Sequence, residues 1–101
     1  MSDERIVVVV RLKVREDAVD EAQKLALGLV ADSRSEDGCI NYDVHQSVDD
    51  PSVFVWHETW KDKKALEEHF EKPYFKAFSA RTGEIAVEPP RVDITKMISE
   101  K

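Results

Sequence analysis

Residues 53–78, with the sequence VFVWHETWKDKKALEEHFEKPYFKAF, contain the change from strand to helix that decides the fold. Residues 53–60 are rich in β-branched and aromatic side chains, which predicts a strand. Since strand side chains alternate between two faces, Glu58 lies in phase with Trp56 and out of phase with His57. We therefore expect Glu58 to point toward the interior and His57 to point toward the other face of the sheet.

A predicted helix follows this strand almost at once. Asp62 can accept a backbone hydrogen bond from the first helical turn, so the helix is expected to run from Lys63 to about Lys72. On its apolar face, His69 lies beside aliphatic and aromatic residues that would pack on the sheet. Pro73 interrupts the helix, and a further short helix continues the apolar stripe. The segment therefore predicts that His69 and the preceding strand meet in the interior.

The other elements follow from the period of the apolar residues along the chain. Residues 5–14 are β-branched and begin apolar on both faces, as in a central strand that is buried on two sides. Residues 39–46 alternate, with Tyr42 in phase with Ile40 and Val44, as in a half-buried strand. A helix is predicted to begin at Glu16, with apolar residues at helical spacing as far as Leu29 and with Gly38 as a stop after it. An irregular connection over residues 82–90 and a final strand over residues 91–99 complete the prediction.

This order of elements, β-α-β-β-α-β, is that of an α+β ferredoxin-like fold. Right-handed crossovers place the first and third strands in the middle of a four-stranded antiparallel sheet, with both helical segments on one face. The other face is expected to carry an apolar patch of four valines, Val7, Val9, Val53 and Val55. Because a monomer rarely exposes such a patch, we predict a homodimer that packs sheet against sheet. Residues 1–101 are expected to form a single domain.

Composition and charge argue against several classes of protein. The chain has a net charge of −6, with its basic residues spread among acidic ones, which argues against nucleic-acid binding. No apolar run approaches the roughly 20 residues of a membrane span, and the acidic N-terminus is a poor secretory signal. With Cys39 as its one cysteine, the chain is expected to be cytoplasmic and to have no internal disulfide.

The sequence also lacks the patterns that hold cofactors. The three histidines stand on separate elements without paired His or Cys spacing, so no metal site is expected. Glycine-rich phosphate loops, dinucleotide fingerprints and nucleophile elbows are absent from the sequence. We therefore expect no metal, flavin or nicotinamide cofactor, and any oxygen chemistry must use electrons from the substrate.

Two motifs give the chain a family resemblance. The first, E-x-G-C-x-x-Y, extends from Glu36 to Tyr42; the second combines E-x-W over residues 58–60 with H-x-x-x-P-x-F-x-A-F from His69 to Phe78. With these motifs, nearly the whole chain resembles the antibiotic biosynthesis monooxygenase family, whose members are small dimeric α+β barrel proteins. The resemblance implies a cofactor-independent monooxygenase that acts on a quinol or a polycyclic phenol. Similar proteins also include haem-degrading enzymes, isomerases of a phosphorylated quorum-sensing sugar derivative, and members of unknown role.

Differences at specific positions narrow these alternatives. Haem-degrading relatives carry an Asn on the first strand, a Trp on the second helix and a His after it. The matching positions here are Val10, His69 and Ser79, so haem degradation is disfavoured. The sugar-phosphate isomerases carry an Asp, a Glu, a Lys and a His, which match in type and approximate spacing Asp43, Glu58, Lys61 and His69. An isomerase therefore stays an alternative, as does a non-enzymatic dimer that only binds a small ligand.

We predict an acid–base pair of Glu58 and His69 in an aromatic-lined pocket; the alternative is a structural hydrogen bond that fixes helix to strand. Histidine suits proton transfer because its ordinary pKa is about 6.5, and a neighbouring carboxylate fixes its tautomer. A phenol or hydroquinone would lose a proton to His69, oriented by Glu58, and its anion would pass electrons to dioxygen. The remaining predicted ligand-binding residues are Trp56 and Phe54 as flat walls, Tyr74 and Phe75 at the pocket mouth, and Asp43 and Lys61 for a phosphorylated sugar.

Overall fold

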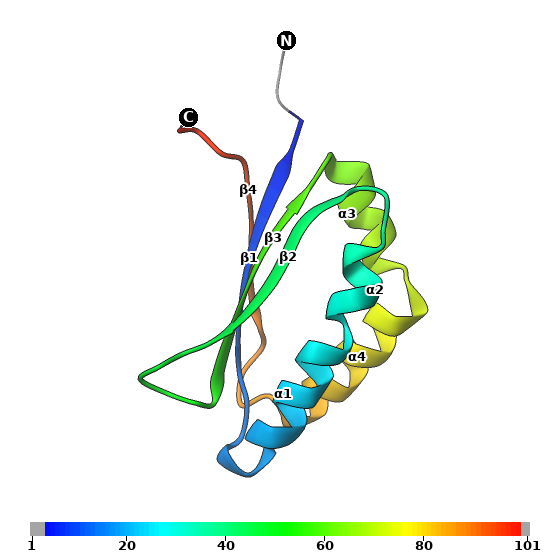
Figure 1. The fold of residues 1–101 in the computed structure, drawn as a ribbon. Coiled ribbons are helices and arrows are strands. Elements are labelled where there is room, and N and C mark those ends of the chain that lie inside the picture. Colours follow the sequence, from blue (N-terminus) through cyan, green and yellow to red (C-terminus); the bar gives the residue numbers. More distant parts are fainter. Residues whose placement is uncertain (1–3, 100–101) are drawn as a thin grey trace.

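The computed structural model describes residues 4–99, which form one antiparallel sheet covered on one face by helices (Figure 1). The strands are β1 (Ile6–Lys13), β2 (Cys39–Gln46), β3 (Val53–Trp60) and β4 (Arg91–Thr95). The helices are η1 (Glu16–Ala18), α1 (Val19–Gly28), α2 (Val30–Arg34), α3 (Lys63–Phe70) and α4 (Pro73–Ile85). The strand order is β2-β3-β1-β4, so the predicted ferredoxin-like α+β fold, with the first and third strands in the centre, is confirmed.

The alternation of side chains in β3 decides which residues face the helices. Trp56, Glu58 and Trp60 are buried, as the sequence predicts. In the strand register, Glu58 lies opposite Val8 of β1 and opposite Tyr42 of β2. Glu58 is thus held in the middle of the sheet, on the face that the helices cover, with a neighbouring strand on each side.

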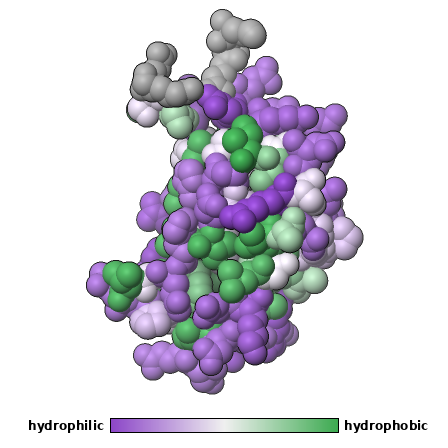
Figure 2. Space-filling model, in the orientation of Figure 1, coloured by the Kyte–Doolittle hydropathy of each residue, from purple (hydrophilic) through white to green (hydrophobic). Residues whose placement is uncertain are grey.

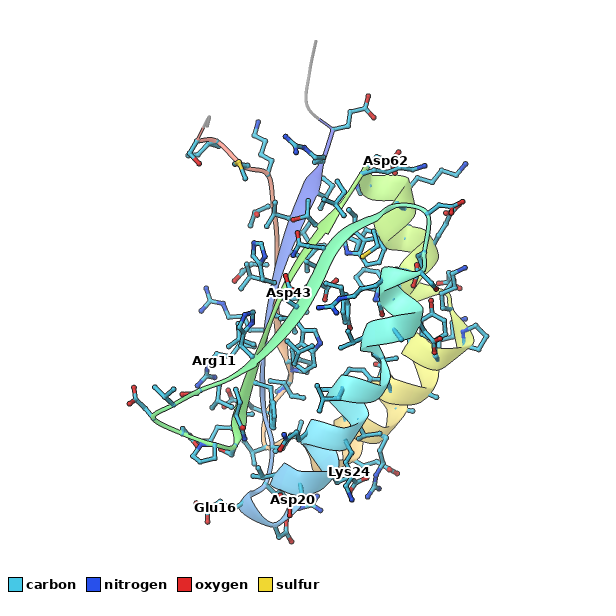
Figure 3. All side chains as sticks on the ribbon, in the orientation of Figure 1. Arg11, Glu16, Asp20, Lys24, Asp43 and Asp62 are labelled. Carbon is cyan, nitrogen blue, oxygen red and sulfur yellow. The ribbon has the colours of Figure 1, made fainter. Side chains whose placement is uncertain are left out.

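The starts of α3 and α4 follow from local chemistry. The Asp62 carboxylate, labelled in Figure 3, accepts a hydrogen bond from the Ala65 backbone N–H at 2.8 Å and caps α3. Pro73 is the first residue of α4, where its missing N–H costs no helical hydrogen bond. α4 continues to Ile85, so the irregular connection expected over residues 82–90 is wrong where the helix occupies it. Ile85 is fully buried, and this packing holds the last turn in the helix.

Two other predictions differ from the structure, the inward direction of Ile40 and the length of the last strand. Ile40, expected to face the core, is 52% exposed because the register shifts at the start of β2. β4 ends at Thr95 instead of extending to residue 99, and it lies at the edge of the sheet next to β1. The first helical segment, by contrast, continues past Leu29 as α2, whose Ser33 side chain is buried, and it ends before Gly38, the predicted stop.

The sheet face away from the helices carries the predicted valines but is not uniformly apolar. The strand register puts these valines along β1 and β3; Val9 is exposed, but Val53 is buried, so the predicted patch is smaller than expected. Polar side chains share this face, among them His57 and Arg11, and Arg11 points away from the helices in Figure 3. Apolar and polar side chains are therefore mixed along the two central strands of this face.

Gly38, immediately before β2, allows α3 to approach closely. A Cβ added to Gly38 would come within 2.3 Å of the Ala65 Cβ. Gly38→Ala is therefore expected to lower the free energy of unfolding by about 1–3 kcal/mol, the usual cost of overpacking. Gly83→Ala is the matched control, because nothing lies within 4 Å of its Cβ position and alanine favours the helix. Urea denaturation should show a loss of stability only for Gly38→Ala, and equal stability of the two variants would contradict this account.

Candidate functional site

A pocket opens between α4 and the face of the sheet that the helices cover. Its volume is about 90 Å³. This is enough for several water molecules or part of a small ligand, since one water needs about 10–15 Å³ of such space. The pocket wall is mainly apolar and includes Val8, Val10, Tyr42, Trp56, Glu58, Phe75, Phe78 and Val92.

Glu58 is the acidic group of this pocket. The residue is only 5% exposed, and its Oε1 accepts a hydrogen bond from the Trp60 indole N–H at 3.0 Å. Burial, opposed by this hydrogen bond and reinforced by the charge of Glu36, raises the pKa of Glu58 to about 7. A carboxyl group with this pKa exchanges a proton readily near neutral pH, as a general acid or base must.

His69 does not form the predicted hydrogen bond with Glu58. Its ring packs against Trp60, with centroids 4.6 Å apart, and its Nδ1 donates to Oε2 of Glu36 at 2.8 Å. His69 is 1% exposed and is not part of the pocket wall. Burial lowers the pKa of His69, although Glu36 acts in the opposite direction, so the imidazole is neutral near pH 7. Each member of the predicted pair is thus satisfied by a different group, Glu58 by Trp60 and His69 by Glu36.

Glu36 is a partner of His69 that sequence reasoning missed. Its side chain is 9% exposed, and the oxygen that accepts from His69 also accepts a hydrogen bond from the Tyr74 hydroxyl. Tyr74 therefore belongs to this cluster and does not line the pocket. The one sequence signal for Glu36 was its place at the start of the E-x-G-C-x-x-Y motif, since 33 residues separate it from His69 along the chain.

The other predicted ligand-binding residues divide between the pocket and the rest of the molecule. Trp56 and Phe75 line the pocket. Phe54 instead lines a second hollow, also of about 90 Å³, between β2 and α1. Figure 2 shows a side of the molecule on which hydrophobic residues gather between the sheet and the helices. Asp43 accepts a hydrogen bond at 2.9 Å from the arginine that ends α2, and Lys61 is exposed, so neither lines the pocket.

Tyr42 is a pocket residue that sequence reasoning did not assign to the site. It is buried, lines the pocket and lies directly opposite Glu58 in the register of β2 and β3. Burial, reinforced by the charge of Glu58, raises the pKa of the Tyr42 hydroxyl well above its usual value, so the hydroxyl stays protonated and can donate. The alternation in β2 predicted its burial, but only the strand register shows that it meets Glu58.

The described residues provide neither a cluster of metal ligands nor a reactive thiol at this site. Among residues 4–99, no group of His, Cys, Asp and Glu side chains is arranged to hold a metal ion. Burial, reinforced by the charge of Glu36, raises the pKa of the Cys39 thiol to about 11, so the nucleophilic thiolate does not form near neutral pH. In a separate respect, no helix in the described part of the chain is long and apolar enough to cross a membrane.

A ferredoxin-like sheet with one helical layer, and an apolar pocket between them that contains a buried carboxyl group, defines a class of small α+β proteins. Residues 5–81 match the antibiotic biosynthesis monooxygenase family. The chain belongs to this family, as its two motifs imply.

Three relatives are similar to nearly the whole chain. "Uncharacterized protein sll1783" of Synechocystis sp. is 32% identical over 95% of this chain, which spans 65% of the length of that protein. "Putative monooxygenase YcnE" of Bacillus subtilis is 34% identical over 91% of this chain and 97% of its own length. The structure of Rv0793 from Mycobacterium tuberculosis has a TM-score of 0.90 at 29% identity, and the match covers 95% of this chain and 97% of that one.

Proposed function

We propose that this chain is a cofactor-independent monooxygenase of quinols or polycyclic phenols, in which Glu58 is the general base. The observation that carries the proposal is the position of Glu58, a carboxyl group with a pKa of about 7 in the wall of a mainly apolar pocket. Membership of the antibiotic biosynthesis monooxygenase family, and the similarity to "Putative monooxygenase YcnE", support the class of reaction.

In the proposed reaction, Glu58 removes a proton from the substrate and leaves an electron-rich anion. The anion passes electrons to dioxygen, and a new carbon–oxygen bond gives a peroxide. Glu58 first returns its proton to the peroxide, which becomes the hydroperoxide. It then removes the second hydrogen of the oxygenated carbon as the O–O bond breaks, so that one oxygen atom stays on the ring as a carbonyl. The other leaves as hydroxide, which takes this proton from Glu58 and departs as water. The substrate supplies the electrons throughout. With anthrone, the balance is anthrone and dioxygen to anthraquinone and water.

The pocket walls support this chemistry because they position the substrate and exclude water from it. Trp56 and Phe75 provide aromatic surfaces for a flat substrate, and the aliphatic wall keeps water away from the reactive anion. The role of His69 as the proton acceptor stays a prediction, and the geometry supports it less well than Glu58 because His69 is outside the pocket wall.

The two alternative functions make different demands on the site. An isomerase of a phosphorylated sugar needs a cation and a polar wall, but Asp43 and Lys61 lie outside this mainly apolar pocket. A non-enzymatic dimer needs only the pocket. We expect oxygen uptake with anthrone or naphthohydroquinone and no thermal shift with phosphosugars. A thermal shift with aromatic ligands in the absence of oxygen uptake would favour the binding role and contradict the monooxygenase.

We also propose that two copies of the chain pair through the open face of the sheet to form the α+β barrel. The exposed position of Val9, on the central strand of a face that the helices leave open, supports this arrangement. Light scattering should give twice the mass of the 11.6 kDa chain, and Val9→Glu should halve it. Val48→Glu is the matched control, since Val48 is 97% exposed in the turn before β3. A wild-type monomer at micromolar concentration would refute the dimer.

A further inference from the structure

Trp56 carries a buried hydrogen-bond donor that is not used within the described structure. The residue is 3% exposed, and its indole Nε1 has no hydrogen-bond partner among residues 4–99. Buried donors in proteins are almost always paired with protein, water or ligand. Because Trp56 lines the pocket, the missing partner can come from a molecule bound there.

The neighbours of Trp56 make this donor part of a polar cluster in the pocket. Trp56 and Glu58 are two residues apart on the same face of β3, and Tyr42 lies opposite Glu58 on β2. The indole lies beside the Tyr42 hydroxyl and acts to lower its pKa, against the larger effect of burial, which raises it, but the two groups do not meet the geometry of a hydrogen bond. Two donors and one ionisable carboxyl group therefore line the same pocket, whereas β1 and β4 contribute aliphatic residues such as Val8 and Val92.

The direction of the indole is fixed by packing from the helical layer. Phe78 of α4 meets the Trp56 ring edge to face, with centroids 5.8 Å apart and ring planes at 73°. A donor held in this way keeps its position when a ligand enters, so the hydrogen bond requires little rearrangement.

We propose that the Trp56 indole N–H donates a hydrogen bond to an oxygen atom of the substrate, and that the pocket thereby selects rings with two separated oxygens. One oxygen is the hydroxyl that loses its proton to Glu58, so the inference rests on the proposed function. The second oxygen accepts from Trp56. Residues two apart on a strand have Cα atoms about 6.6 Å apart, so the two contacts reach different oxygens. A ring oxygenated on opposite sides, as in a 1,4-hydroquinone or its monoether, satisfies both.

The test compares two ligands of nearly the same shape, 4-methoxy-1-naphthol and 4-ethyl-1-naphthol, which differ in the acceptor oxygen. Their affinities are measured by calorimetry without dioxygen, for the wild-type protein and for Trp56→Phe. This variant keeps an aromatic ring but lacks the N–H, so the ratio of methoxy to ethyl affinity should fall about five- to tenfold. An unchanged ratio would overturn the inference, and so would failure of both naphthols to bind the wild-type protein.

A second measurement does not depend on the folding of the variant. The chain contains two tryptophans, and the indole N–H of Trp60 already donates to Glu58. In a ¹⁵N spectrum of the wild-type protein, the methoxy ligand should move the other indole resonance, that of Trp56, downfield more than the ethyl ligand does. Equal shifts with both ligands would overturn the inference. Oxygen uptake with anthrone is read separately, and its absence would contradict the monooxygenase while leaving the binding result intact.

Discussion

Glu58→Gln should lower oxygen consumption with anthrone by at least about 100-fold while the protein stays folded. Glutamine has nearly the shape of glutamate and can still accept the hydrogen bond from Trp60, but it cannot take up a proton. Initial rates in an oxygen electrode, with calorimetry of a bound naphthol in parallel, would separate loss of chemistry from loss of binding. Glu68→Gln, an exposed change on α3, is the matched control and should keep the wild-type rate. An unchanged rate in Glu58→Gln would exclude Glu58 as the base.

The pH dependence of the rate gives this assignment an independent readout. Only the ionised form of Glu58 can accept a proton, and its pKa is about 7. The wild-type kcat/KM should therefore rise with pH through about 7 and level off above it. The residual rate of Glu58→Gln should lack this step.

The stability of the same variant reports the pKa without any substrate. The pKa of Glu58 is about 7 in the folded protein, compared with an ordinary value of 4.5. The folded state therefore binds this proton more tightly, and the resulting stabilisation is complete below pH 4.5 and is lost as the pH rises through about 7. The difference corresponds to about 3 kcal/mol. The free energy of unfolding of Glu58→Gln minus that of the wild type should therefore be larger above pH 7 than below pH 4.5, by about this amount. If this difference between the two proteins does not change with pH, the raised pKa is contradicted.

The second large effect is expected on stability. His69→Ala should lower the free energy of unfolding by about 3–5 kcal/mol. The change removes a ring packed against Trp60 and Phe75, and it leaves the nearly buried Glu36 carboxylate without one of its two hydrogen bonds. Urea denaturation would measure the loss. The matched control is Glu67→Ala, an exposed change on the same helix α3, which should cost less than about 1 kcal/mol.

Oxygen consumption by His69→Ala distinguishes a structural role from a catalytic one. Because His69 lies outside the pocket wall, we expect the variant to consume oxygen wherever it is folded, for instance at low temperature. Near-UV circular dichroism would establish the folded fraction under the assay conditions. A folded variant without activity would instead support the acid–base role that the sequence predicts for His69.

Much of the fold could be predicted because strands and helices have short, regular periods. The alternation through Trp56, Glu58 and Trp60 identified the buried face of β3, and Asp62 marked the start of α3. The errors arose where longer-range packing decides the outcome. The burial of Ile85 extends α4 beyond its predicted end, and the register shift at the start of β2 exposes a residue that alternation would bury.

The sequence by itself determined the order of the elements, the inward direction of Glu58 and the burial of His69. It could not determine which side chains meet, because hydrogen-bond partners depend on strand register and helix placement. The tertiary structure decided that His69 forms its hydrogen bond with Glu36 and that Glu58 forms its hydrogen bond with Trp60. It also decided that Glu58, but not His69, lines the pocket. The physical reason is that a buried polar group pairs with whichever partner the packing brings within reach, and that partner can lie far away in the chain.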